Sequence, residues 1–433
     1  MQERVILCGQ YPVLSFPFDQ RSGRAAGTGV VLDRARLPLE LTTHGKLAVY
    51  ARRIDEWWRR RAIPPTRDGI RRALDSLGMR SPVDLLNHSY GLSLSDLYWV
   101  KPADDPANWG DVNFFENPFD EELGRALLTG VSSSHRFSFN VPDASTGGDL
   151  PKRWSVAADG TRVLVKGGRT GQEPVNETIA SSLAARLGIP AVGYRLGEYH
   201  NRPVSLCADM LDGHEELVSA WQVLGSVKRD NRLSLRDEWI RDASGFGCDR
   251  GEIMRATDDW LLVDWLMRNT DRHFNNFGLI RDVDTLRVRP APLFDTGESL
   301  WCGELRVDNG DCRAKPFYAT AKSPTARRQL RLISDWSRFD LSLLDDWPDE
   351  VAHRLSATGM LPPSRIAMIR DALHDRIGYA SAVRDESVRR LVRGAVAEEL
   401  DMRQDTGLAQ APPSTAPGEV PGSSADPDCG IGI

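Results

Sequence analysis

Two carboxylates and an amide carry the strongest chemical signal in the chain. Asp271 is followed five positions later by Asn276, and Asp295 comes after the short apolar segment Pro292-Leu293-Phe294. Phosphoryl transfer needs a base for the acceptor hydroxyl and hard oxygen ligands for Mg²⁺, and these side chains supply both. We therefore predict that Asp271 is a catalytic base and that Asn276 and Asp295 are metal ligands.

A lysine and a glutamate further upstream are candidates for holding nucleotide phosphates. An Asp159-Gly160 turn joins two short extended segments, which predicts a hairpin whose second strand ends at Lys166. Glu177 falls in the first turns of a helix predicted over residues 175–187. The two could form an ion pair that positions ATP phosphates. The alternative is a solvated lysine and an acid that the helix dipole favours.

Two loops flank this predicted hairpin. The loop over residues 145–152 contains Gly147 and Gly148, and its backbone N–H groups could face phosphate oxygens, although most such loops are ordinary turns. Residues 209–213 leave a predicted small antiparallel sheet, where a hinge would hold an adenine ring. Asp209 and Leu211 are the candidate binding residues there.

Helices and a second hairpin should position the catalytic residues. Helices are predicted over residues 215–224, 235–243 and 251–267, with Thr257 as an N-cap within the last, and again over 325–332, 341–355, 364–379 and 386–402. Strands at 276–280 and 287–289 would place Asp271 before a hairpin and Asp295 after it. Both carboxylates should therefore face one site.

The residues between Asp271 and Asn276 have competing interpretations. Arg272 either binds a phosphate or braces the loop by pairing with an acid, and bracing is favoured. His273 is predicted to be a packed, hydrogen-bonded loop residue, because no second type of metal ligand clusters with it.

The N-terminal region and the composition set limits on the other functions. Small strands are predicted up to Leu32, followed by two helices between Ala48 and Leu77 whose arginines form either a docking face or a solvated surface. A formal charge of −6 argues against nucleic acid or an anionic membrane as the main partner. The six scattered cysteines and the lack of a leader or a long apolar run predict a soluble, cytoplasmic protein.

The motifs together resemble the HipA-like serine/threonine kinases, in particular their C-terminal kinase domain. The resemblance lies in the segments 154–168, 176–190, 269–277 and 292–295, taken in that order along the chain. It implies an α+β, bilobal protein-kinase-like fold with a small antiparallel-sheet N-lobe, a mostly helical C-lobe and an additional N-terminal region. It also implies ATP and Mg²⁺ as cofactors and phosphorylation at a loop serine or threonine, here Ser145 or Thr146.

Residue by residue, the resemblance implies that Lys166 and Glu177 are the pair that holds phosphate. It also implies that Asp271 is the catalytic base and that Asn276 and Asp295 are the metal ligands. The expected divisions are an accessory region over 1–130, an N-lobe over 131–213, a C-lobe over 214–403 and a disordered tail over 404–433. The expected partners are a protein substrate with a serine or threonine acceptor and an antitoxin or regulatory protein. A small-molecule kinase of the aminoglycoside-phosphotransferase type and a catalytically idle nucleotide-binding module are the alternatives.

Overall fold

A computed structural model describes residues 1–42, 48–67, 69–129, 141–315, 317 and 325–407. The chain divides into two compact units, Met1–Val383 and Arg384–Ile433. In the part of the chain that is described, no helix has both the length and the apolar composition needed to cross a membrane. The fold is mixed α and β with antiparallel sheets, as expected from the sequence.

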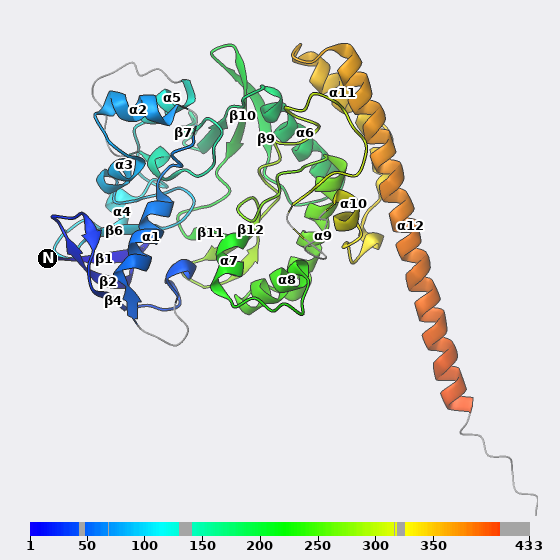
Figure 1. Ribbon diagram of the computed structural model, residues 1–433, viewed down its shortest axis with the longest axis horizontal. Coiled ribbons are helices and arrows are strands. Elements are labelled where there is room, and N and C mark those ends of the chain that lie inside the picture. The colour runs from blue at the N-terminus through cyan, green and yellow to red at the C-terminus, as the bar shows by residue number, and fades with distance from the viewer. Residues whose placement is uncertain (43–47, 68, 130–140, 316, 318–324, 408–433) are drawn as a thin grey trace, which may run out of the picture. The chain divides into compact units, whose positions relative to one another are not determined.

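The N-terminal region is built on a six-stranded sheet (Figure 1). Its strands are β1 (Gln2–Cys8), β2 (Tyr11–Asp19), β3 (Arg24–Ala25), β4 (Thr28–Val31), β5 (Ala48–Tyr50) and β6 (Tyr98–Pro102), in the order β5-β4-β2-β1-β6 with β3 paired to β2. The predicted helical segment beginning at Ala48 is wrong for its first three residues, because β5 pairs with β4 there. The small strands predicted before Leu32 are confirmed.

Short helices follow this sheet. They are η1 (Leu39–Leu41), α1 (Ala51–Arg61), α2 (Ile70–Leu77), α3 (Pro82–His88), α4 (Trp109–Val112), α5 (Glu122–Thr129) and η2 (Pro142–Ser145). Ile54 and Trp57 of α1 are buried and pack with the sheet residues Ile6, Leu14 and Val100. Helix α1, which leads into the turn before α2, is therefore packed on the sheet.

A four-stranded antiparallel sheet and one helix form the next layer. The strands β7 (Lys152–Val156), β8 (Arg162–Lys166), β9 (Tyr194–Tyr199) and β10 (Arg202–Ala208) lie in the order β7-β8-β10-β9, with α6 (Gln172–Arg186) packed against β9 and β10. The hairpin predicted around Asp159-Gly160 is confirmed. In the second hairpin His200 and Asn201 both have positive φ, at 51° and 58°, as a tight two-residue turn requires.

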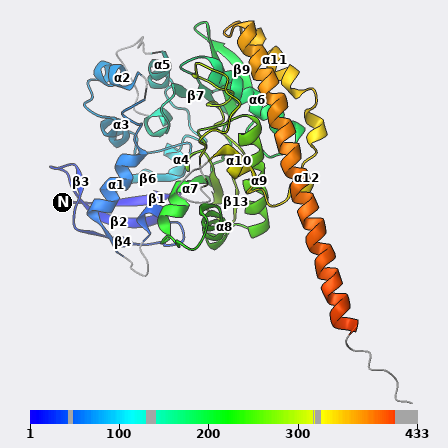
Figure 2. The same ribbon diagram turned by 45° about the vertical axis from the view of Figure 1, so that its right-hand side comes forward.

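The remaining elements are mostly helical and enclose the largest core. They are β11 (Glu215–Ser219), α7 (Ala220–Ser226), α8 (Leu235–Gly245), α9 (Arg250–Leu266), β12 (Gly278–Asp282), β13 (Val288–Pro290), α10 (Ala326–Leu330), η3 (Trp336–Arg338), η4 (Leu341–Leu344), α11 (Trp347–Ala357) and α12 (Pro363–Gly407). Figure 2 shows α8 beside α9, and the two helices pack together. Trp239 and Trp260 from these helices contact Phe277, which anchors the start of β12.

Three helix predictions in this part need correction. Residues 215–219 form strand β11 instead of a helix, because they pair with β12. Gly278 permits this pairing, since a Cβ there would lie 2.3 Å from the Val218 carbonyl oxygen. Thr257 lies inside α9, whose N-cap is Asp249, and its hydroxyl donates to the Ile253 carbonyl. The two helices predicted at 364–379 and 386–402 are one helix, α12. Disorder was predicted from position 404, but residues 404–407 belong to α12; the rest of the predicted tail lies outside the described residues.

Candidate active site

A pocket of about 590 Å³ lies between the four-stranded sheet and the loop that holds Asp271. This volume suits a nucleotide-sized ligand. Eight of the nine residues predicted from the sequence line it: Gly147, Gly148, Lys166, Asp209, Leu211, Asp271, Asn276 and Asp295. The ninth, Glu177, does not line the pocket but contacts Lys166. The fold therefore brings the predicted residues together from segments that are far apart in the sequence.

Lys166 joins two carboxylates at the inner end of the pocket. Its Nζ forms an ion pair with Glu177 and a second one with Asp295, at 2.6 Å from Asp295 Oδ1. Burial alone would lower the pKa of Lys166, but the Asp295 and Glu177 carboxylates outweigh burial and hold this pKa well above its usual value. Lys166 is thus a buried, permanently charged ammonium group. The predicted pairing of Lys166 with Glu177 is present in the structure.

Asp295 is held in an unusual backbone conformation. Its φ is 57°, in the left-handed region that a non-glycine residue seldom adopts. The next residue, Thr296, donates its backbone N–H and its hydroxyl to Glu177 Oε2, each at 3.1 Å. Burial would raise the pKa of Asp295, but Lys166 and Lys152 outweigh burial and lower it. Asp295 therefore presents an ionised carboxylate to the pocket.

Asp271 and Asn276 lie in the loop between α9 and β12. The Asn276 side-chain amide donates to the Asp271 carbonyl at 3.0 Å, so the two residues keep a fixed spacing. Asp271 Oδ1 accepts a hydrogen bond from Lys315 at 2.9 Å. Asp271 Oδ2 lies 3.8 Å from His273 Nε2, which is longer than a hydrogen bond. One carboxylate oxygen of Asp271 is therefore held, and the other can receive an acceptor hydroxyl.

Arg272 braces this loop, as favoured from the sequence. Its guanidinium is 1% exposed and pairs with Asp264 of α9 at 2.9 Å. It also donates to the carbonyl oxygens of Asn276 at 2.7 Å and Phe294 at 2.6 Å. One side chain thereby ties α9, the Asn276 turn and the segment before Asp295 together. His273 is hydrogen-bonded through Nδ1 to the Asn275 backbone but is partly exposed at the pocket, so the prediction that it is packed is wrong.

The donor set at Asn276 and Asp295 fits a Mg²⁺ ion. The Nδ2 group of Asn276 is used within the loop, and its Oδ1 has no partner among the described residues. Asp295 uses Oδ1 for Lys166 and lines the pocket. Mg²⁺ takes few protein oxygens and completes its shell with water and phosphate, so two such ligands are sufficient.

The residues predicted to form a hinge also line the pocket. Asp209 Oδ1 accepts from the Leu211 backbone N–H at 3.1 Å, which closes a tight turn at the end of β10. Burial raises the pKa of Asp209 to about 7. Met210 and Leu211 give this wall an apolar surface suited to a planar ring.

Lys152 lines the pocket and has no predicted role from the sequence. It is the register partner of Lys166 across the β7–β8 hairpin, so both ammonium groups face the same side of the sheet. Burial lowers the pKa of Lys152 to about 8, against the opposing effect of Asp295. The signal that could have found it is the register of the Asp159-Gly160 hairpin, because residues directly opposite each other share a face.

Part of the chain is similar to a known family. Residues 142–347 match the family model described as the HipA-like C-terminal domain, which confirms the resemblance inferred from the motifs. This segment contains every predicted site residue, from Gly147 to Asp295.

Individual known proteins are similar to parts of the chain. The serine/threonine-protein kinase CtkA of Helicobacter pylori is 27% identical over 142 residues, which cover 29% of this chain and 40% of CtkA. The chain therefore spans less than half the length of this curated relative. The crystal structure of the Helicobacter pylori proinflammatory kinase CtkA covers 56% of this chain at 16% identity, with a TM-score of 0.45.

A solved structure with broader coverage is HipA of Shewanella oneidensis MR-1, from a toxin–antitoxin complex with HipB and operator DNA. It covers 88% of this chain and 99% of that HipA chain, at 15% identity and a TM-score of 0.54. Coverage of this extent includes much of residues 1–130 as well as the family domain. The similarity in fold therefore extends into the N-terminal region, which the sequence motifs did not reach.

Proposed function

We propose that this protein is an ATP- and Mg²⁺-dependent serine/threonine protein kinase in which Asp271 is the catalytic base. The observation that supports this most strongly is the convergence of the Lys166–Glu177–Asp295 cluster and the Asp271–Asn276 loop on one pocket. A phosphoryl-transfer site needs cations for the phosphates, oxygen ligands for a metal and a base for the acceptor, and this pocket contains all three. The related kinase CtkA supports the same class of reaction.

Each residue has a role that follows from its position. Lys166 binds phosphate oxygens with a charge that Glu177 and Asp295 maintain, and the hinge at Asp209 and Leu211 contacts the base of the nucleotide. Asp271 accepts the proton of the serine or threonine hydroxyl and orients it. Bound at Asn276 and Asp295, Mg²⁺ would neutralise charge on the phosphates. The pocket walls hold these groups in place before the reaction, so little reorganisation is needed.

The same proposal extends to the organisation of the chain. Residues 131–213 and 214–403 act as the N-lobe and C-lobe of a bilobal kinase, and residues 1–130 form an accessory region. The substrate is a protein with a serine or threonine acceptor, and the protein acts in the cytoplasm. HipA of Shewanella oneidensis is found with HipB, so a small antitoxin or regulatory protein is the partner to seek first.

The test is transfer of the γ-phosphoryl group from labelled ATP with Mg²⁺. We expect label on serine or threonine of this protein or of a protein from a cell extract, identified by mass spectrometry. Label appearing only on small hydroxylated compounds would assign the protein to the small-molecule kinases instead. Binding of ATP without transfer to any hydroxyl acceptor would support an idle nucleotide-binding module.

The buried position of Lys152 predicts a pH-dependent affinity for ATP. Its pKa of about 8 means that only about one molecule in ten keeps this ammonium at pH 9, whereas most keep it at pH 7. Because Lys152 lines the pocket and faces the same side of the sheet as Lys166, we propose that its charged form also binds phosphate, so the Kd for ATP should rise about tenfold from pH 7 to pH 9. Isothermal titration calorimetry at constant ionic strength measures this change.

The matched variant is Lys152→Met. It should bind ATP more weakly than wild type at pH 7 and should show little further loss at pH 9, because the titrating group is absent. An unchanged pH dependence in Lys152→Met would show that another group causes it.

A further inference from the structure

Arg67 is a buried arginine of the N-terminal region. It contacts the loop over residues 145–152, which lines the pocket and is called the glycine loop below. Arg67 lies in the turn between α1 and α2 and is 2% exposed. Its Nε donates to the Gly148 carbonyl at 3.0 Å, and its Nη2 donates to the Gly147 carbonyl at 2.7 Å and to the Thr146 carbonyl. Arg67 forms no ion pair with an acid in the described part of the chain. The partners of this buried guanidinium are therefore three consecutive loop carbonyls.

This contact determines where the loop amides point. In a planar trans peptide the N–H points away from the carbonyl of the same unit. With three carbonyls turned toward Arg67, the N–H groups of Gly147, Gly148 and Asp149 must point to the other side. None of these three N–H groups has a hydrogen-bond acceptor among the described residues. The residues that carry them line the pocket.

Other features show that the loop is shaped for this arrangement. Gly148 has a φ of 88°, which a side chain would disfavour, and a Cβ there would lie 2.4 Å from Lys152 Nζ. Thr66 donates its hydroxyl to Asp149 at 2.6 Å, and the Ile63 backbone N–H donates to the Ala144 carbonyl at 3.2 Å. The turn before α2 thus contacts the loop at several points along its length. Successive free amides in such a turn bind anions.

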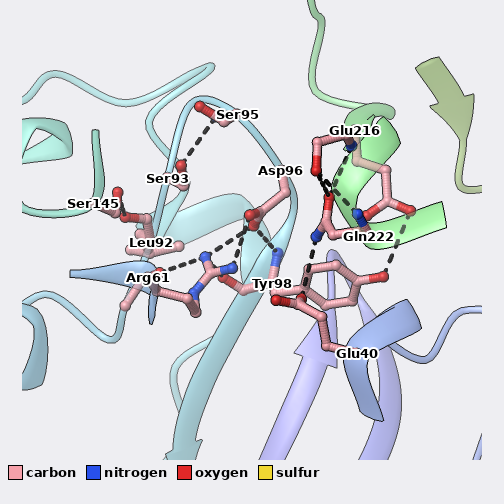
Figure 3. Close-up of polar contacts among 12 residues, drawn as sticks. Glu40, Arg61, Leu92, Ser93, Ser95, Asp96, Tyr98, Ser145, Glu216 and Gln222 are labelled. Carbon is pink, nitrogen blue, oxygen red and sulfur yellow. Dashed lines mark hydrogen bonds and ion pairs between the residues drawn. The ribbon is translucent and has the colours of Figure 1, made fainter. Parts of the chain in front are cut away.

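The N-terminal region also contacts strand β11 (Figure 3). Tyr98 of β6 and Glu216 of β11 are buried and in contact at 3.5 Å, and Arg281 of β12 donates to the Tyr98 hydroxyl at 3.0 Å. The Leu217 backbone N–H donates to the Ser95 carbonyl at 3.0 Å. The N-terminal region that carries Arg67 is therefore also in contact with β11 and with β12, the strand that follows Asn276.

We infer that Arg67 is a positioning residue for phosphate binding. By holding the carbonyls of residues 146–148, it aims the amides of Gly147, Gly148 and Asp149 at the phosphates of the nucleotide. Arg67 thereby sets the geometry of the active site without lining the pocket itself. This inference rests on the proposed function and adds a specific role for residues outside the matched family domain.

The test compares Arg67→Lys and Arg67→Met with wild type. Arginine donates from several nitrogens in one plane, whereas lysine is a single point of charge, so both variants should lose the loop geometry and Arg67→Met should lose more. We expect the Kd for Mg²⁺-ATP to rise about tenfold in Arg67→Met and the Kd for adenosine to stay within about twofold. Amide hydrogen exchange of the nucleotide-free protein should rise in the peptide that covers residues 144–150, at Thr146, whose backbone N–H donates to the Asp143 carbonyl at 3.3 Å.

Arg61→Lys is the control, because the Arg61 side chain is 7% exposed and also belongs to the N-terminal region, but it pairs with Asp96 and does not contact the loop. It should leave ATP affinity and loop exchange unchanged. If the Arg67 variants do not fold, Thr66→Val removes the neighbouring contact with Asp149 and should show the same changes at smaller size.

Equal losses of ATP and adenosine affinity, or unchanged loop exchange in a folded Arg67 variant, would overturn the inference. A wild-type protein that binds no ATP would instead refute the proposed function. In that case the exchange measurement would still decide whether Arg67 orders the loop.

Discussion

Asp271→Asn should reduce phosphoryl transfer by about 10²–10⁴-fold, the usual contribution of a positioned general base. Asparagine keeps the shape of the side chain but cannot accept the hydroxyl proton. The Asp271 carbonyl still accepts from Asn276 in this variant, so the loop should keep its conformation. Binding of Mg²⁺-ATP should stay within about twofold of wild type, because Asp271 has no role in holding phosphate.

The measurements are single-turnover transfer from labelled ATP and calorimetric binding of Mg²⁺-ATP. Asp346→Asn is a suitable control, because Asp346 is an exposed acid that also pairs with a basic residue, Arg186. Transfer at the wild-type rate in Asp271→Asn would refute the assignment of Asp271 as the base. Loss of both transfer and ATP binding would point to a structural role instead.

Arg272→Met should destabilise the protein by about 3–5 kcal/mol, the typical cost of removing one partner from a buried ion pair. The substitution leaves the buried Asp264 carboxylate of α9 without its cationic partner. It also leaves the backbone carbonyls of Asn276 and Phe294 without their hydrogen-bond donor. Burial already raises the pKa of Asp264, and Arg272 opposes this effect. Without Arg272 the pKa should rise further.

The rise in the pKa of Asp264 makes the destabilisation by Arg272→Met depend on pH. A carboxyl whose pKa is raised in the folded state costs stability as the pH rises from its unfolded value through its folded value. The destabilisation by Arg272→Met should therefore be larger at pH 8 than at pH 5. Urea denaturation at the two pH values measures it.

Two further variants separate the ion pair from general disruption. Arg272→Met combined with Asp264→Asn should recover part of the loss, because no unpaired charge remains. Arg370→Met, which removes an exposed arginine paired with Asp371, should leave the free energy of unfolding almost unchanged. A cost for Arg272→Met that matches this surface variant would show that the brace contributes little.

Local sequence patterns predicted several elements well. The Asp159-Gly160 hairpin could be predicted because a tight turn has specific backbone requirements that few dipeptides meet. The periodicity of residues 175–187 placed α6 and, with it, Glu177 near the strand that ends at Lys166. Wrong predictions arose where pairing with a distant strand overrode helix periodicity, as at Glu215–Ser219, whose partner β12 lies far along the chain.

The partner of Arg272 illustrates an intermediate case. The sequence favoured a bracing role with an acid, and Asp264 stands as an isolated carboxylate in the apolar end of α9. A buried acid in such a helix needs a partner, so the pair was within reach of sequence reasoning. Lys315, which contacts Asp271, had no comparable signal because it lies in an irregular segment.

The order and chemical types of the residues, which the sequence alone contains, determined the candidate roles of Lys166, Glu177, Asp271, Asn276 and Asp295. These roles depend on what each side chain can donate, accept or bind, and that chemistry belongs to the residue type. The tertiary structure alone decided which distant groups share the pocket, including the contact of Arg67 with the glycine loop. Such contacts depend on how separate elements pack together, and no local sequence pattern predicts them.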